Sequence, residues 1–181
     1  GDIDILEMDV KAELNFVTRM MNCPILPYSF TKYAERMLEI LEDMQGKSEK
    51  VRAYFNIYPV IERAETFVEL SKHLDSAIEE KGKGLSEDEL KQLNTNLMWI
   101  SRHINPVVHS NAGPSEQMTM ETFGALPFPR IAEIVDLANM TLHQSHEFKL
   151  LKNKLLRQRN IVEEGFYQAN TLIQQTLAML E

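Results

Sequence analysis

The stretch FKLLKNKLLRQRNIVEEGFYQANTLIQQTLAML, residues 148–180, decides the fold. It contains no proline and one glycine. As an α-helix with a rise of 1.5 Å per residue, it would extend about 50 Å. Its apolar residues recur three or four positions apart, which predicts one long helix that forms the spine of a bundle. The residues of this first row are Phe148, Leu151, Leu155, Val162, Phe166, Ala169, Ile173, Leu177 and Leu180.

A second apolar row lies about 100° around the same predicted helix, which widens its apolar sector towards half of the circumference. One neighbouring helix does not cover so wide a sector, so a further partner is expected, either from this chain or from a second copy. The alternative is a helix at the centre of its own domain, surrounded by its own chain. The second row consists of Leu150, Ile161, Gly165, Leu172 and Met179.

The composition sets the broad class of the protein. The 181 residues are 44 % hydrophobic and 25 % charged, which is typical of a globular domain, alone or with part of another. The formal net charge of −8 argues against a nucleic-acid partner or an anionic membrane surface, because both need a basic patch. The single cysteine, Cys23, permits no internal disulfide, and no apolar run approaches the length of a membrane span.

The first segment, residues 2–26, is predicted to be a helix followed by an extended connector. Ile3, Leu6 and Val10 begin one apolar stripe, while Ile5 and Met8 begin another on the opposite side. A helix that is apolar on both sides belongs between two layers. We therefore expect this segment to be the tail of an upstream domain and residues 27–181 to form the helical-bundle domain.

Local signals divide the rest of the chain into further helices. Ser29 is predicted to cap one helix that ends near Gly46, and Pro59 is predicted to lie in the first turn of the next. Ser86-Glu87-Asp88-Glu89 is a capping box that begins another helix, which Asn105-Pro106 is predicted to stop. The predicted fold is all-α, a four-helix up-down core with a long C-terminal helix and an extra N-terminal helix.

No motif predicts a catalytic or metal site in this chain. Neither His-Glu-x-x-His nor Glu-x-x-His occurs. His143 and His146 stand three apart, as two ligands on one helix face would, but no third ligand has a matching spacing. Trp99 lies off the apolar stripe of its predicted helix. It therefore either lies flat on a neighbouring helix or contributes to an interface, where tryptophan is enriched.

Several segments, in this order, resemble the transferrin-receptor-like dimerisation domain, the C-terminal helical domain of glutamate carboxypeptidase-type zinc peptidases and of the transferrin receptor. In that family the domain pairs with its copy in a second subunit, while the zinc ligands and the general base lie in an upstream peptidase domain. The resemblance therefore implies a homodimer, zinc only upstream, and an extracytoplasmic location. The segments are Leu26-Pro27-Tyr28 followed by Tyr33-Ala34, Phe67-Val68-Glu69-Leu70-Ser71, Leu97-Met98-Trp99-Ile100-Ser101-Arg102 before Asn105-Pro106, Phe128-Pro129-Arg130-Ile131, and the final helix.

One family feature is missing from this sequence. Glutamate carboxypeptidases carry a Lys-Tyr pair shortly before Phe-Pro, in a loop that closes over the carboxylates of a C-terminal glutamate. The corresponding positions here hold Thr122 and Phe123, so the cation that would pair with a glutamate is absent. The loop, residues 107–126, is therefore expected either to line a pocket for a neutral substrate or to be a surface connection.

These observations lead to one principal hypothesis, in which the chain is a non-catalytic homodimerisation domain of a larger peptidase-like or receptor-like protein. Its partners would be a second copy and the upstream domain, with no nucleic acid and no membrane contact. A second hypothesis is a contribution to the parent enzyme's active site, and a third is a free-standing helical adaptor whose first helix docks on its own bundle. The predicted dimer interface comprises Met98, Trp99, Arg102, Leu150, Ile161, Leu172 and Met179.

Overall fold

The computed structural model describes residues 2–46, 49–110 and 127–181, and the regular elements of this part of the chain are all helical. The all-α prediction is therefore confirmed. In chain order the elements are α1 (Ile3–Asn22), α2 (Thr31–Gly46), α3 (Glu49–Tyr54), α4 (Tyr58–Lys81), the 3-10 turn η1 (Gly82–Gly84), α5 (Glu87–His109), the 3-10 turn η2 (Pro129–Ile131), α6 (Ile134–Asn139) and α7 (His146–Leu180).

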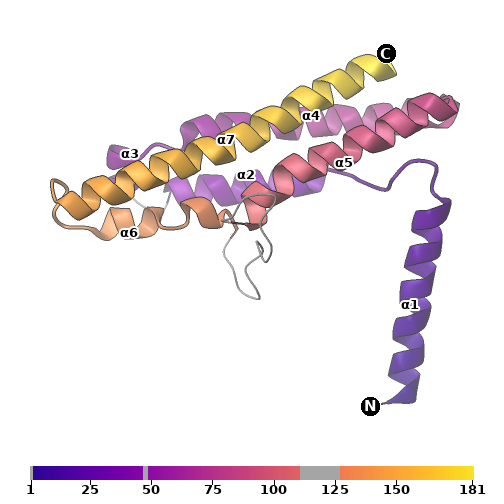
Figure 1. Cartoon of the computed structure of the whole chain (residues 1–181), viewed down its shortest axis with the longest axis horizontal. Helices are drawn as coiled ribbons and strands as arrows, with labels where there is room; N and C mark the ends of the chain where they lie inside the picture. The colour runs from indigo at the N-terminus through magenta and orange to yellow at the C-terminus, as the bar shows by residue number, and fades with distance from the viewer. Residues whose placement is uncertain (1, 47–48, 111–126) are drawn as a thin grey trace.

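Four long helices, α2, α4, α5 and α7, form the bundle, and each runs opposite to the one before it (Figure 1). Helix α7 packs against both α4 and α5, and α2 packs against α4. Two hydrogen bonds show that α4 and α7 run parallel. Arg159, in the first half of α7, donates to the Asn56 carbonyl oxygen just before the start of α4. Lys81, the last residue of α4, donates to the carbonyl oxygen of Leu180, the last residue of α7.

Helix α7 is the predicted spine, and Ser145 caps its start by accepting a hydrogen bond from the Phe148 amide. Most of the first apolar row is buried, and Leu151 and Leu177 are half-buried against the core. The centre of the bundle is aromatic. Phe166 packs edge-on to Phe67 of α4, with 5.8 Å between the ring centroids, and its ring lies 6.3 Å from that of Phe128.

The chain's own core covers much of the second apolar row. Gly165 is buried beneath Val107 of α5, and Leu172 and Met179 are half-buried against the core. Leu150 and Ile161 remain exposed. The wide apolar sector thus reflects a central position in the bundle along most of its length and leaves an exposed apolar face only in the first half of α7.

Helix α5 begins as predicted but ends later than predicted. The capping box is present, since the Glu89 amide donates to the Ser86 hydroxyl and the Ser86 amide donates to the Glu89 carboxylate. Pro106 does not stop the helix, which continues to His109. A proline removes one helical hydrogen bond. Burial of the Val107 and Val108 side chains stabilises the helix beyond Pro106. The prediction of a stop at Pro106 was therefore wrong.

The start of α2 also differs from the prediction. Ser29 does not cap the helix as proposed but donates a hydrogen bond of 2.9 Å to the carboxylate of Asp75 in α4. The same carboxylate accepts from both the hydroxyl and the amide of Thr31, the first residue of α2. A side chain from a neighbouring helix therefore stabilises the positive end of the α2 dipole.

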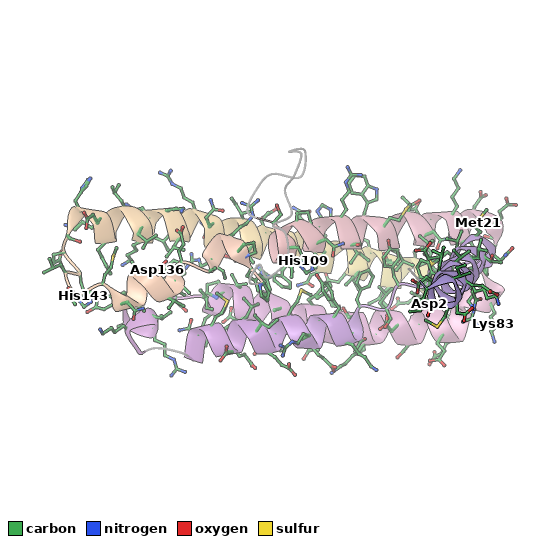
Figure 2. All side chains as sticks on the ribbon, turned by 90° about the horizontal axis from the view of Figure 1, so that it is seen from below. Asp2, Met21, Lys83, His109, Asp136 and His143 are labelled. Carbon is green, nitrogen blue, oxygen red and sulfur yellow. The ribbon has the colours of Figure 1, made fainter. Side chains whose placement is uncertain are left out.

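Helix α1 does not pack on the bundle, and none of its residues is buried. It projects from one end of the long bundle (Figure 1). Figure 2 looks nearly along α1 and places it at the end that carries Lys83, opposite the end that carries His143. The following connector, by contrast, is attached to the bundle. Asn94 of α5 accepts a hydrogen bond from the Leu26 amide and donates one to the Pro24 carbonyl oxygen, both 2.8 Å long.

Candidate interaction surface

A group of four side chains on the outer face of α5, which we call the Trp99 patch, comprises Met98, Trp99, Arg102 and His103. Met98 and Trp99 are 50 % and 46 % exposed and are neighbours in the sequence, so together they form an exposed apolar patch. The four positions span about one and a half turns of α5 and share one side of it, because residues three and four apart are neighbours on a helix. They therefore form one continuous surface.

Contacts within the Trp99 patch hold its side chains in place. The Arg102 guanidinium carbon lies 5.1 Å from the centre of the Trp99 ring, a cation–π geometry. The His103 ring lies 6.1 Å from the Trp99 ring on the next turn. A tryptophan already supported by an arginine loses less side-chain freedom on binding, so the patch is suited to contact another protein surface.

His103 is partly buried, and this burial makes the folding stability of the chain depend on pH. Burial lowers the pKa of His103 below the ordinary value, and the nearby Glu164 carboxylate offsets part of the effect. Below about pH 6.5, the ordinary histidine pKa, the unfolded chain therefore binds more protons at this site than the folded chain does. The contribution of His103 to folding stability is present above that pH and is lost as the pH falls.

We expect the variant His103→Gln to lose less unfolding free energy than the unchanged chain when the pH is lowered from about 7 to about 5. Urea unfolding over a series of pH values measures the two slopes. Identical slopes for the two chains would show that the His103 pKa is the same in the folded and unfolded states.

The second exposed apolar face lies on the first half of α7. Leu150 is 56 % exposed and Ile161 is 43 % exposed. They are eleven positions apart, about three helical turns, and so point in nearly the same direction. Arg157 lies between them on this face and is exposed, and Lys154 at its edge pairs with Glu133 at 2.6 Å. We call Leu150, Lys154, Arg157 and Ile161 the α7 face.

The structure does not bring all the predicted interface residues together. Helix α5 runs antiparallel to α7, and Asn96 of α5 donates a hydrogen bond to Thr176 near the end of α7. The Trp99 patch therefore lies beside the second half of α7, whereas Leu150 and Ile161 lie in its first half. Leu172 and Met179 are half-buried against the core.

Helix α1 carries the largest exposed apolar surface among the described residues. Its two apolar sides are both open to solvent, and apart from the half-buried Met20 the exposed fraction of its large apolar side chains ranges from 46 % at Val10 to 81 % at Met21. Such contiguous surfaces on a folded protein usually mark interaction sites. The exposed members are Ile3, Ile5, Leu6, Met8, Val10, Leu14, Phe16, Val17 and Met21.

The two histidines considered as metal ligands have different surroundings. The ring of His143 packs on Tyr54, 4.2 Å away, and lies 5.4 Å from the Phe148 ring, so its main contacts are aromatic. His146 is exposed at the first residue of α7. Within residues 2–46, 49–110 and 127–181, no group of three or more His, Cys, Asp or Glu side chains is arranged to hold a metal ion.

A pair of residues that the sequence analysis missed links α2 to α5. The Tyr33 hydroxyl lies 2.8 Å from Nε2 of His109, and the two rings stack. Burial raises the pKa of Tyr33 to about 12, so the phenol is neutral and able to donate a hydrogen bond. No local pattern in the sequence indicates a pair separated by 76 positions. Thr122 and Phe123, the two predicted pocket residues, lie outside the described part of the chain.

The fold and the exposed surfaces place the chain in a general class, the all-α helical bundles with apolar surface available for protein contacts. No protein-family model, curated protein or solved structure matches the chain. None of the helices in the described ranges is both long enough and apolar enough to cross a membrane.

Proposed function

We propose that this chain is a non-catalytic homodimerisation module of a larger glutamate carboxypeptidase-like zinc peptidase or receptor-like protein. The observation that carries the proposal is the Trp99 patch, in which an exposed tryptophan is flanked by an exposed methionine and supported by an arginine. These three residue types are enriched in protein interfaces, and tryptophan and arginine are frequent energetic hot spots.

A twofold-symmetric interface suits this patch. In such an interface the same surface of each copy is used, so one exposed tryptophan supplies two anchors. Aromatic rings and guanidinium groups also stack on each other, so the patch is compatible with a second copy of itself. The chain as a whole has a net charge of −8, but the charged group in contact with the Trp99 ring is the cationic Arg102.

The proposed relation to zinc peptidases rests on the order of the resembling segments. In the all-α bundle those segments fall in the connector and α2, in α4, in α5, at η2 and in α7. Any zinc ligands and general base would lie in an upstream domain, and this chain would contribute assembly. The adaptor alternative expects α1 to pack on its own bundle, and the complete absence of buried residues in α1 gives it no support.

Sedimentation equilibrium of the unchanged chain and of Trp99→Glu tests the assembly role. We expect the unchanged chain to dimerise and Trp99→Glu to weaken the dimer about 30-fold or more, because losing a hot spot costs at least about 2 kcal/mol.

A matched control is Tyr58→Glu, since Tyr58 is an aromatic residue of similar exposure, 48 %, at the start of α4. It should leave the dimer unchanged. A monomeric unchanged chain over a wide concentration range, or equal weakening by both variants, would contradict the proposal.

A further inference from the structure

A cavity of about 400 Å³, which we call the α2–α4 cavity, lies where the end of α2, the short helix α3 and the start of α4 meet. Its volume falls within the range of about 300–1,000 Å³ that is usual for ligand sites. Two of its lining side chains, Tyr58 and Ile61, are aromatic or aliphatic, and its other described lining residues carry charges or hydrogen-bonding groups. The cavity therefore has room and polar partners for a ligand of about the size of one amino-acid residue.

One lining residue, Gln45 at the end of α2, has a buried hydrogen-bond donor that is not used. The Gln45 side chain is 3 % exposed, and its Oε1 atom accepts a hydrogen bond of 3.1 Å from the Ile57 amide. That bond orients the side-chain amide and leaves its Nε2 atom without a hydrogen-bond partner among the residues that the structure describes. Buried N–H groups normally have a partner, because an unpaired one has lost its hydration without compensation. An oxygen atom of a ligand in the cavity would supply the missing acceptor.

A second donor lies at the same end of the α2–α4 cavity. The Arg52 Nε atom donates a hydrogen bond of 3.3 Å to the Gln45 backbone carbonyl oxygen, which places the Arg52 guanidinium beside Gln45. Within the described part of the chain, this guanidinium forms no ion pair with a carboxylate. Gln45 and Arg52 therefore make a donor end, which favours a carbonyl or carboxylate oxygen of the ligand.

The α4 side of the cavity is acidic. Glu62 and Glu65 lie one turn apart on the face of α4 that lines the cavity, and Glu42 of α2 adds a third carboxylate. None of the three forms an ion pair with another residue of the described ranges. Like charges three or four positions apart on a helix repel each other, and a cation between them removes the repulsion. This side of the cavity therefore favours a cationic group of the ligand.

The antiparallel packing of α2 and α4 separates the donor end from the acidic side. Gln45 is hydrogen-bonded to Ile57, directly before the start of α4. Glu62 and Glu65 lie further along α4, about 6 Å and 10 Å beyond Tyr58 at a rise of 1.5 Å per residue. An extended arginine or lysine residue has a comparable distance between its peptide carbonyl group and its cationic head group.

We propose that the α2–α4 cavity binds a basic residue of a peptide, with the cationic head group at Glu62 and Glu65 and the peptide carbonyl oxygen at Gln45. Arginine suits this site best, because its planar guanidinium presents five donors to carboxylates on adjacent turns. Its aliphatic part would lie against Tyr58 and Ile61, as the stems of long basic side chains commonly cover apolar surface. The cavity is separate from the Trp99 patch on α5, and the proposal does not depend on the homodimer.

NMR titration of the ¹⁵N-labelled full chain with N-acetyl-arginine amide tests the inference. We expect a dissociation constant of about 1 mM, an ordinary value for a ligand of this size. The largest chemical-shift changes should occur at the Gln45 side-chain amide and at Glu62 and Glu65. N-acetyl-citrulline amide has the same shape without the charge. It should bind about tenfold or more weakly, because charge-assisted hydrogen bonds are about twice as strong as neutral ones.

A pair of double variants tests the carboxylates. Glu62→Gln with Glu65→Gln should weaken the binding of N-acetyl-arginine amide about tenfold or more. The control is Glu69→Gln with Glu80→Gln, two exposed residues of α4 that do not line the cavity and undergo the same change of charge. It should bind the ligand as the unchanged chain does. Circular dichroism checks that the helices of both variants are intact.

Three results would overturn the inference. The first is an absence of shift changes at the cavity up to about 10 mM ligand, tenfold above the expected dissociation constant. The second is equal binding of the arginine and citrulline amides. The third is equal weakening by the two double variants, which would indicate general attraction to an acidic chain. None of them bears on the homodimer, which Trp99→Glu tests separately.

Discussion

Replacement of Phe166 by alanine is expected to lower the free energy of unfolding by about 3–5 kcal/mol. The Phe166 side chain is fully buried at the point where α7 meets α4 and the segment that leads into η2. It contacts the rings of Phe67 and Phe128. Alanine would leave a cavity in this aromatic cluster, since a packed core collapses only partly around a deleted side chain.

The position of Phe128 adds to the expected loss of stability. Its backbone is in the left-handed conformation, with φ of 57°, which is uncommon for a residue other than glycine. Its amide donates to the Val108 carbonyl oxygen at 2.9 Å, and its ring is fully buried. Packing against Phe166 helps to hold Phe128 in this strained conformation. The loss of Phe166 would therefore also destabilise the backbone at the start of η2.

Thermal and urea unfolding measure the effect of Phe166→Ala. For a chain of this length, about 3–5 kcal/mol corresponds to a decrease in Tm of roughly 6–20 °C. Tyr167→Ala is the matched control, because Tyr167 is the adjacent aromatic residue and its side chain is exposed beside Arg63. It should cost about 1 kcal/mol or less. Equal losses in the two variants would show that Phe166 is not a centre of the core.

The periodic features of this fold could be predicted from the sequence because they depend on local spacing. The first apolar row of α7 gave its length and its buried face, and the capping box gave the start of α5. Both signals arise within a few residues of the structure they specify. The position of Trp99 off the apolar stripe of α5 was also correctly predicted, but whether its ring covers a neighbouring helix or is exposed was left open, and the structure leaves it 46 % exposed.

Features that depend on distant residues could not be predicted. The carboxylate that stabilises the start of α2 belongs to Asp75, more than 40 positions away. The continuation of α5 past Pro106 depends on Val107 meeting Gly165 of α7. The partial burial of Leu172 and Met179 likewise requires knowledge of how the helices pack around α7. The sequence specified which faces are apolar, and only the packing shows which of them the chain covers itself.

This distinction bears directly on the candidate interface. The two apolar sides of α1 and the whole second row on α7 were both predicted to exceed what one bundle covers. No residue of α1 is buried, whereas along α7 the excess is confined to Leu150 and Ile161. The exposed apolar surface thus lies at both ends of the bundle and on α5.

Replacement of Gly165 by alanine tests how closely α5 and α7 approach. In an exposed helix this change would stabilise by about 1 kcal/mol through helix propensity. Here the added Cβ atom would lie 2.7 Å and 3.0 Å from the two methyl carbons of Val107 and 3.1 Å from the His103 carbonyl oxygen. The Val107 side chain is stiff, because it is branched at Cβ within a helix, so it cannot turn away without strain.

We therefore expect Gly165→Ala to lower the free energy of unfolding by about 1–3 kcal/mol, the usual cost of overpacking a core. Combining it with Val107→Ala should recover part of the loss, because the shorter side chain removes the two methyl contacts. A double-mutant cycle by urea unfolding measures this coupling, expected to be about 1 kcal/mol or more. A Gly165→Ala variant more stable than the unchanged chain, with no coupling to position 107, would mean that the two helices lie farther apart than the structure places them.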